Sequence, residues 1–180
     1  RAVYLVALLG VAVVGPNLGL VGVAVADAPN CASVSYAGAG TTASPFQVGN
    51  AEQLQCIGEN HADASSQNDA LGSDYLLVSD VDASGTSAWN GESGFDPIGD
   101  RETPFTGTFD GNEHTITGLY IDRSEVRRAG LFGALGSSAS VETVPLENVD
   151  VPGYGDVGGL VGANDGTVVE SRVSGSVTGS

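Results

Sequence analysis

Short apolar runs separated by turn residues dominate the chain after Ala26. Each run contains a few Val, Ile, Leu or Thr residues and ends at Gly, Asp, Asn or Pro, a pattern typical of short strands. Helical periodicity is confined to residues 51–57, where AEQLQCI follows a turn-like Gly-Asn pair and offers Leu54 and Ile57 for burial. We therefore predict an all-β chain with one short helix. The predicted strands are residues 75–81, 115–121, 140–144, 147–151 and 167–177.

Internal repetition indicates how these strands are arranged. The sequence AGLFG at 129–133 recurs as GGLVG at 158–162, an offset of 29, and NVDVPG at 148–153 is echoed by SGSVTG at 174–179, an offset of 26. A unit of about 30 residues with short strands and glycine corners predicts one coil of a parallel β-solenoid, in which each coil buries its inward side chains against its neighbours. The predicted inward residues are Ile116, Leu119, Ile121, Leu131, Leu160, Val173 and Val177.

The N-terminal segment is apolar and carries no charge from Ala2 to Ala26. It ends in Ala-Val-Ala, the pattern that a signal peptidase reads, so we interpret residues 1–26 as an export signal. A retained membrane anchor is the alternative, because the run is long enough to cross a bilayer, although Pro16 interrupts it. The chain begins at Arg1 and ends within a repeat, so we expect it to be part of a longer protein.

Cys31 and Cys56 are the only cysteines. Export makes a disulfide between them the default expectation. Neither lies in a CxxC or Cys/His spacing, so we expect no zinc site.

The charge balance excludes several functions. Six arginines and no lysine stand against 22 acidic residues, which gives a formal charge of −16 and a pI near 4.1. Such a chain lacks the basic surface that nucleic-acid binding needs and the lysine of a Walker-type site. An acid excess of this size favours a protein that works in concentrated salt, where the charges are screened. An acidic secreted protein from an ordinary habitat is the alternative.

The motifs GLFG and GLVG, the latter within VGGLVGANDGTVVESRVSGSVTG, resemble GLUG repeats. Such repeats occur in bacterial and archaeal surface proteins and in the N-terminal regions of IgA-specific metalloendopeptidases. Upstream, SPFQVGNAEQLQCIGEN resembles the leading cap, DYLLVSDVDASG the first long strand, and GFDPIGDRETPFTGTFDGNEHTITGLYIDR the coil that enters the repeats. One departure is Glu113, where the family usually has a glycine.

The resemblance implies a right-handed parallel β-helix on a cell surface. It divides the chain into the signal peptide at 1–26, a cap with one short helix and a first coil at 27–104, and GLUG-type repeats at 105–180. It carries no activity, because no catalytic residues belong to the repeats. The structural repeat residues are Gly130, Leu131, Gly133, Gly159, Leu160 and Gly162.

Protease and hydrolase motifs are missing from the sequence. His61 and His114 are far apart and form no HExxH motif, and the chain has no GxSxG elbow. We expect His114 to close a turn by hydrogen bonding.

Carboxylates offer one weak candidate site. Asp80 and Asp82 point to the same side of a strand, and Asp110 could lie nearby with Arg101 or Arg123 as a cationic partner. This set could bind Ca²⁺ or a sugar, although solvated faces are the commonest fate of paired carboxylates. No EF-hand loop or nonapeptide calcium repeat is present, so we expect no cofactor.

The single tryptophan and a cluster of three arginines each allow a structural and a functional interpretation. We expect Trp89 to be buried, although an exposed tryptophan would stack on a sugar. Arg123, Arg127 and Arg128 are expected to neutralise carboxylates of adjacent coils, or else to contact an acidic partner.

These features predict an extracellular, surface-displayed module for adhesion or a rigid spacer, without catalytic residues in this segment. Its partners would be extracellular glycans or proteins and no nucleic acid, with membrane contact only through the signal segment or a C-terminal anchor. The alternatives are a β-helical enzyme that degrades polysaccharides with acidic residues and the non-catalytic stalk of a larger surface peptidase.

Overall fold

The computed structural model describes residues 27–123 and 127–180, so the predicted export signal lies outside the described residues. Within these ranges, no helix is both long and apolar enough to cross a membrane. The helices, in chain order, are the 3-10 helix η1 (Cys31–Ser33), α1 (Ala51–Cys56), α2 (Gln67–Gly72) and the 3-10 helix η2 (Ser84–Ala88). The strands are β1 (Phe46–Val48), β2 (Tyr75–Leu77), β3 (Val81–Asp82), β4 (Thr108–Asp110), β5 (Ile116–Thr117), β6 (Arg128–Ala129), β7 (Phe132–Leu135), β8 (Ser140–Glu142), β9 (Pro145–Gly153), β10 (Asp156–Val157), β11 (Val161–Asn164), β12 (Thr167–Val169) and β13 (Arg172–Gly179).

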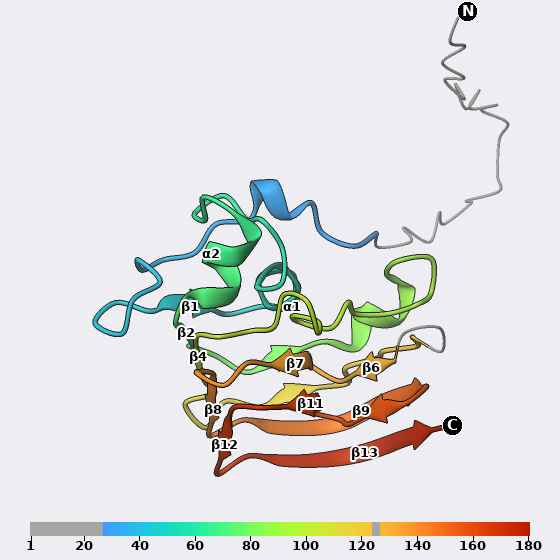
Figure 1. Ribbon diagram of the computed structural model, residues 1–180. Helices are drawn as coiled ribbons and strands as arrows, with labels where there is room; N and C mark the ends of the chain where they lie inside the picture. The colour runs from blue at the N-terminus through green and yellow to red at the C-terminus, as the bar shows by residue number, and fades with distance from the viewer. Residues whose placement is uncertain (1–26, 124–126) are drawn as a thin grey trace, which may run out of the picture.

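The fold is mostly β, as predicted, and its strands stack in layers (Figure 1). The first sheet has the order β1-β2-β4-β8-β12 and the second β13-β9-β5-β3, while β6 pairs with β10 and β7 with β11. Every pair of named strands is parallel. Within each sheet the neighbours follow the order of the sequence, so the chain leaves a sheet and returns to it one strand further along.

The repeat offsets of 29 and 26 residues found in the sequence also separate residues that pair between neighbouring strands. Phe132 lies opposite Val161, an offset of 29. Val151 lies opposite Val177, an offset of 26. Between β9 and β13 the offset falls from 27 at Val173 to 26 at Gly175, at a register irregularity.

Several predicted strands are shorter or divided. The run 75–81 forms β2 and β3, and the run 167–177 forms β12 and β13. In both cases the first strand belongs to the first sheet and the next strand to the second, so the chain turns a corner between them. Val78, at one such corner, is 42% exposed. The run 115–121 contains only β5, 140–144 contains β8, and 147–151 lies within the longer β9.

Two α-helices lie at one end of the stack (Figure 1). The predicted helix is present as α1, where the side chain of Asn50 accepts a hydrogen bond from the backbone N–H of Gln53 at 2.8 Å. The prediction of a single helix was wrong, because α2 also forms. Its N-cap is Ser66, and it buries Ala70 and Leu71. The predicted disulfide joins Cys31 in η1 to Cys56 at the end of α1.

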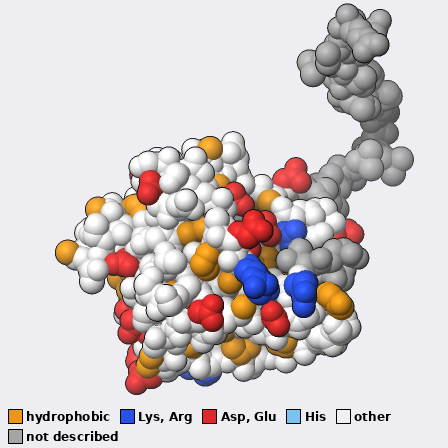
Figure 2. Space-filling view, in the orientation of Figure 1, with side chains coloured by type: hydrophobic (Ala, Val, Ile, Leu, Met, Phe, Trp, Pro, Cys, Tyr) orange, Lys and Arg blue, Asp and Glu red, His pale blue; other side chains and the backbone are white. Residues whose placement is uncertain are grey.

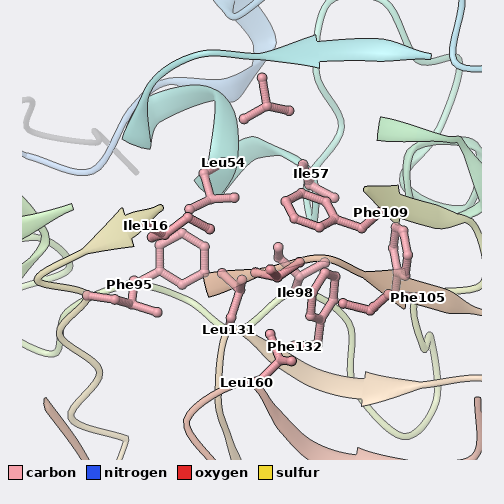
Figure 3. Close-up of a cluster of buried hydrophobic side chains, with 14 of the residues drawn as sticks. Leu54, Ile57, Phe95, Ile98, Phe105, Phe109, Ile116, Leu131, Phe132 and Leu160 are labelled. Carbon is pink, nitrogen blue, oxygen red and sulfur yellow. The ribbon is translucent and has the colours of Figure 1, made fainter. Parts of the chain in front are cut away.

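A continuous apolar core runs through the stack and includes an aromatic row (Figure 3). The rings of Phe105 and Phe132 lie 5.1 Å apart, and those of Phe109 and Phe132 lie 5.5 Å apart. Contacts of this kind stabilise a core beyond the area that they bury. Of the residues predicted to face inward, five are buried: Ile116, Leu119, Ile121, Leu131 and Leu160.

Val173 and Val177 lie opposite the buried Leu146 and Val151, as the inward prediction requires, but they are 42% and 43% exposed. Both lie on β13, which forms the edge of the second sheet and pairs with β9 alone. A side chain between layers is buried only when a layer covers it from each side, and no described layer covers β13 on its outer side.

The repeat glycines are explained mainly by close approach of backbones. A Cβ built on Gly133 would lie 2.3 Å from the carbonyl oxygen of Gly99, and one on Gly162 would lie 2.9 Å from the carbonyl oxygen of Gly133. Among the four repeat glycines only Gly130 has a positive φ in the range that favours glycine, at 159°. The layers therefore pack too closely at these corners for a side chain.

Candidate functional site

The carboxylates proposed from the sequence as one site each accept hydrogen bonds, either within a turn or from a neighbouring layer. Asp80 accepts hydrogen bonds from the backbone N–H of Thr115 at 2.9 Å and from the ring of His114 at 3.4 Å. Asp82 accepts from the backbone N–H of Ser84 at 2.9 Å. Asp110 accepts hydrogen bonds from the Thr143 hydroxyl and from the backbone N–H of Asn112, both at 2.7 Å. Among the described residues, no ion pair joins any of the three to Arg101 or Arg123.

These hydrogen bonds lower the pKa of two of the carboxyl groups. The backbone N–H of Thr115 and then the His114 ring lower the pKa of Asp80, and hydrogen bonds from Ser84 lower the pKa of Asp82. A general acid in glycoside hydrolysis needs a raised pKa. The pKa values of Asp80 and Asp82 shift in the opposite direction, because both carboxylates accept hydrogen bonds. No group of three or more His, Cys, Asp or Glu residues in the described ranges is placed to hold a metal ion.

Two single-residue predictions are confirmed. Trp89 is buried, with 5% of its surface exposed. The backbone N–H of His114 donates to the carbonyl oxygen of Gly111 at 2.8 Å and so closes the turn in which it lies.

The structure instead reveals a pocket of about 350 Å³ that collects basic side chains. It lies between the end of α1, the start of α2, the loop at 96–103 and the beginning of β6. Arg101, Arg127 and Arg128 contribute to its lining, and Figure 2 shows basic side chains gathered on this face beside acidic ones. The lining residues are Gln55, Gly58, Glu59, Gln67, Asp96, Pro97, Gly99, Asp100, Arg101, Glu102, Thr103, Arg127 and Arg128.

The arginines at the pocket differ in how they are paired. Arg123, just outside the lining, contacts Asp96 at 3.1 Å. The Nε atom of Arg128 lies 3.6 Å from Asp156, which is too long for a hydrogen bond. The Nε atoms of both arginines are buried and have no hydrogen-bond partner among the described residues. The prediction that this group neutralises carboxylates of adjacent layers therefore holds for Arg123 and Arg128.

Two acidic residues of the lining are already engaged. One oxygen of Asp100 accepts the backbone N–H groups of Glu102 and Thr103 and the Thr103 hydroxyl, at 2.7 to 3.0 Å. The Thr103 backbone bond is the main cause that lowers the pKa of Asp100. Asp96 is held by Arg123 and by its backbone, which exchanges hydrogen bonds with the Gln55 side chain at 2.8 and 3.1 Å.

Sequence reasoning missed this pocket because its parts are distant along the chain. Arg101 was grouped with Asp80 and Asp82, whereas it lies with Arg127 and Arg128. One signal was present, since four of the six arginines fall between residues 101 and 128.

Comparisons with known proteins give two relatives. The chain is 42% identical over 147 residues to Halomucin from Haloquadratum walsbyi, covering 80% of this chain and 2% of that protein. It is 32% identical over 141 residues to a protein named as a Gly-rich membrane protein from Evansella cellulosilytica, covering 76% of this chain and 15% of the relative. No family model matches the chain. No solved structure matches it with significance.

Proposed function

We propose that the chain is an exported, surface-displayed right-handed parallel β-helix that serves as an adhesion or binding module or as a rigid spacer, without catalysis in this segment. The stack of parallel strands at the repeat offsets of 26 and 29 residues carries this proposal. A solenoid presents an extended face whose length grows with the number of coils, which suits display and spacing.

The finer organisation belongs to the same proposal. Residues 1–26 act as the export signal, residues 27–104 form the cap and first coil, and residues 105–180 form GLUG-type repeats. The disulfide within residues 27–104 supports an oxidising compartment, because such bonds persist outside the cytosol.

The relatives support a surface location. One is named Halomucin, and the other is named as a membrane protein. The chain spans only 2% and 15% of their lengths, so the activity of the whole protein is part of the proposal. The formal charge of −16 and the similarity to Halomucin support a protein of a saline habitat.

Export provides the direct test. The full chain, preceded by a start codon, is expressed in a salt-adapted host, and the surface fraction is measured by protease treatment of intact cells. We expect the wild type and Asn17→Gln to be cleaved from outside, and Leu8→Arg to remain inside, because a charge within the apolar run blocks a signal segment. Protection of the wild type in intact cells, with cleavage only after lysis, contradicts the proposal.

A further inference from the structure

We propose that the pocket between α1, α2 and β6 binds the carboxylate of a uronic acid unit in an acidic polysaccharide. This inference rests on the proposed function and names a ligand class for the binding module. It is carried by four features of the pocket, which concern its cations, its acids, its shape and the charge of the surrounding surface.

The cations of the molecule converge on this one place. Five arginines lie in the described ranges, and four of them line the pocket or pair with a residue that lines it. The fifth, Arg172, pairs with Glu147 at 3.3 Å. In a chain with 22 acidic residues, cations that only neutralise neighbours would be spread over the surface. Their concentration at a hollow indicates an anionic ligand.

The donors that remain after internal pairing suit a carboxylate. Arg101 and Arg127 line the pocket and make no ion pair with a described residue. The planar guanidinium group binds a carboxylate through two parallel hydrogen bonds, which gives it an advantage over a point charge. The lining also contains four acids, Glu59, Asp96, Asp100 and Glu102. Arg123 and the turn at Thr103 hold Asp96 and Asp100, and neither Glu59 nor Glu102 makes an ion pair with a described arginine.

The remaining lining fits the hydroxyl groups of a sugar. Gln55, Gln67 and Thr103 line the pocket, and no aromatic ring does. Gln55 and Thr103 are held by Asp96 and Asp100, whereas Gln67 donates one N–H to the carbonyl oxygen of Gly58 at 2.8 Å and keeps its second N–H and its oxygen for a hydroxyl group. Desolvation by burial, followed by the charge of Asp96, raises the pKa of Glu59, which also lines the pocket. A nucleobase or an aromatic ligand would call for a stacking surface, which the lining lacks.

The size of the hollow and the charge around it narrow the ligand further. Arg101 and Arg128 also line a second hollow of about 270 Å³, so these two arginines are shared by both hollows. The surrounding surface is strongly acidic, with a formal charge of −16 for the chain. A ligand with one charge for each sugar is repelled less than a polyphosphate or a densely sulfated chain.

Binding is tested with the full chain in buffer of high ionic strength. Trigalacturonate is titrated by calorimetry against the wild type, the double variant Arg101→Gln/Arg127→Gln and the control Arg172→Gln. We expect the double variant to lose affinity by about tenfold or more, because each charge-assisted hydrogen bond contributes more than a neutral one. The control keeps the affinity of the wild type. Thermal unfolding of all three proteins confirms that the substitutions leave the fold intact.

Two further ligands complete the experiment. The neutral galactose trisaccharide should bind at least about tenfold more weakly than trigalacturonate, because it lacks the carboxylates. A sulfated galactose trisaccharide distinguishes carboxylate from sulfate. The proposal is overturned if the wild type does not bind trigalacturonate, if the neutral or sulfated sugar binds as well, or if Arg172→Gln loses as much affinity as the double variant. If the protein cleaves trigalacturonate and releases new reducing ends, the ligand class is supported but the non-catalytic function is contradicted. If the chain is exported but does not bind trigalacturonate, this inference fails while the proposed function is unaffected.

Discussion

At the residue scale, the buried side chain of His61 has a hydrogen-bond partner on each ring nitrogen. His61 is 2% exposed, and its Nε2 atom lies 3.1 Å from the hydroxyl of Tyr75. That hydroxyl donates to the carbonyl oxygen of Ala70 at 2.9 Å, which assigns the His61 proton to Nε2. The backbone N–H of Asp63 then donates to Nδ1 at 3.3 Å. The neutral imidazole thus has a partner on each nitrogen, while a proton on Nδ1 would displace one of them.

This arrangement predicts how stability depends on pH. Burial lowers the pKa of His61, against an opposing effect of the Asp63 charge. Below about pH 6.5 the unfolded chain therefore binds a proton that the folded chain resists, so stability falls as the pH falls, by at most about 1.4 kcal/mol per pH unit. Unfolding curves at pH 7.5 and 5.5 should show a smaller loss for His61→Gln than for the wild type. His114→Gln, which retains the buried histidine, should behave like the wild type, and an equal loss in all three proteins would contradict the assignment.

Backbone strain gives a second prediction at this scale. Glu113 has a φ of 64°, in the left-handed region that disfavours residues with a Cβ. Its side chain is exposed, so a glycine would relieve strain without losing a buried contact. We expect Glu113→Gly to stabilise the fold by about 0.5–1 kcal/mol, measured by urea unfolding. Glu113→Ala is the control and should bring no such gain, because alanine retains the Cβ.

At the element scale, corners decide where strands begin and end. The run 75–81 reads as one strand but divides into β2 and β3, which belong to different sheets. Sequence patterns locate apolar runs well, but they do not show where a run turns from one sheet to the next. The helix α2 was missed for a related reason. It has a capping serine at Ser66, but its two buried residues, Ala70 and Leu71, are adjacent, so no apolar spacing of three or four residues marks the helix.

Close contact between layers predicts a strong effect at Gly133. Gly133 lies within β7, and a Cβ at this position would lie 2.3 Å from the carbonyl oxygen of Gly99, so the strand and the loop at Gly99 would have to move apart. We expect Gly133→Ala to lower the free energy of unfolding by about 1–3 kcal/mol or more. Gly85 in η2 is the matched control, because no atom lies within 4 Å of a Cβ built there. Equal stability of the two alanine variants would refute the explanation.

At the scale of the whole molecule, the acidic charge and the apolar core oppose each other. The aromatic rings of Phe105, Phe109 and Phe132 hold successive layers together, while 22 acidic residues against six arginines repel one another over the surface. Salt weakens only the repulsion, because the Debye length falls from about 10 Å at 0.1 M to about 3 Å at 1 M.

The balance predicts that the full chain becomes more stable as salt is added. Circular dichroism of the full chain in sodium chloride between about 0.1 and 3 M should show a rising melting temperature, with roughly 2–4 °C for each kcal/mol gained. Sucrose of matched osmolality should give a smaller rise, because it does not screen charge. Maximal structure in dilute buffer would contradict a role for screening.

The sequence by itself determined the mostly β character, the positions of many turns, the disulfide pair and the offsets of 26 and 29 residues that the strand pairing follows. These properties depend on local preference, composition and repetition, which can be read along a chain. Only the tertiary structure decided that Arg101 meets Arg127 and Arg128 at one pocket, that Val173 and Val177 stay exposed, and that Gly133 cannot carry a side chain. Each of these depends on which layer lies above or below a residue, and that neighbour is fixed by packing across the stack.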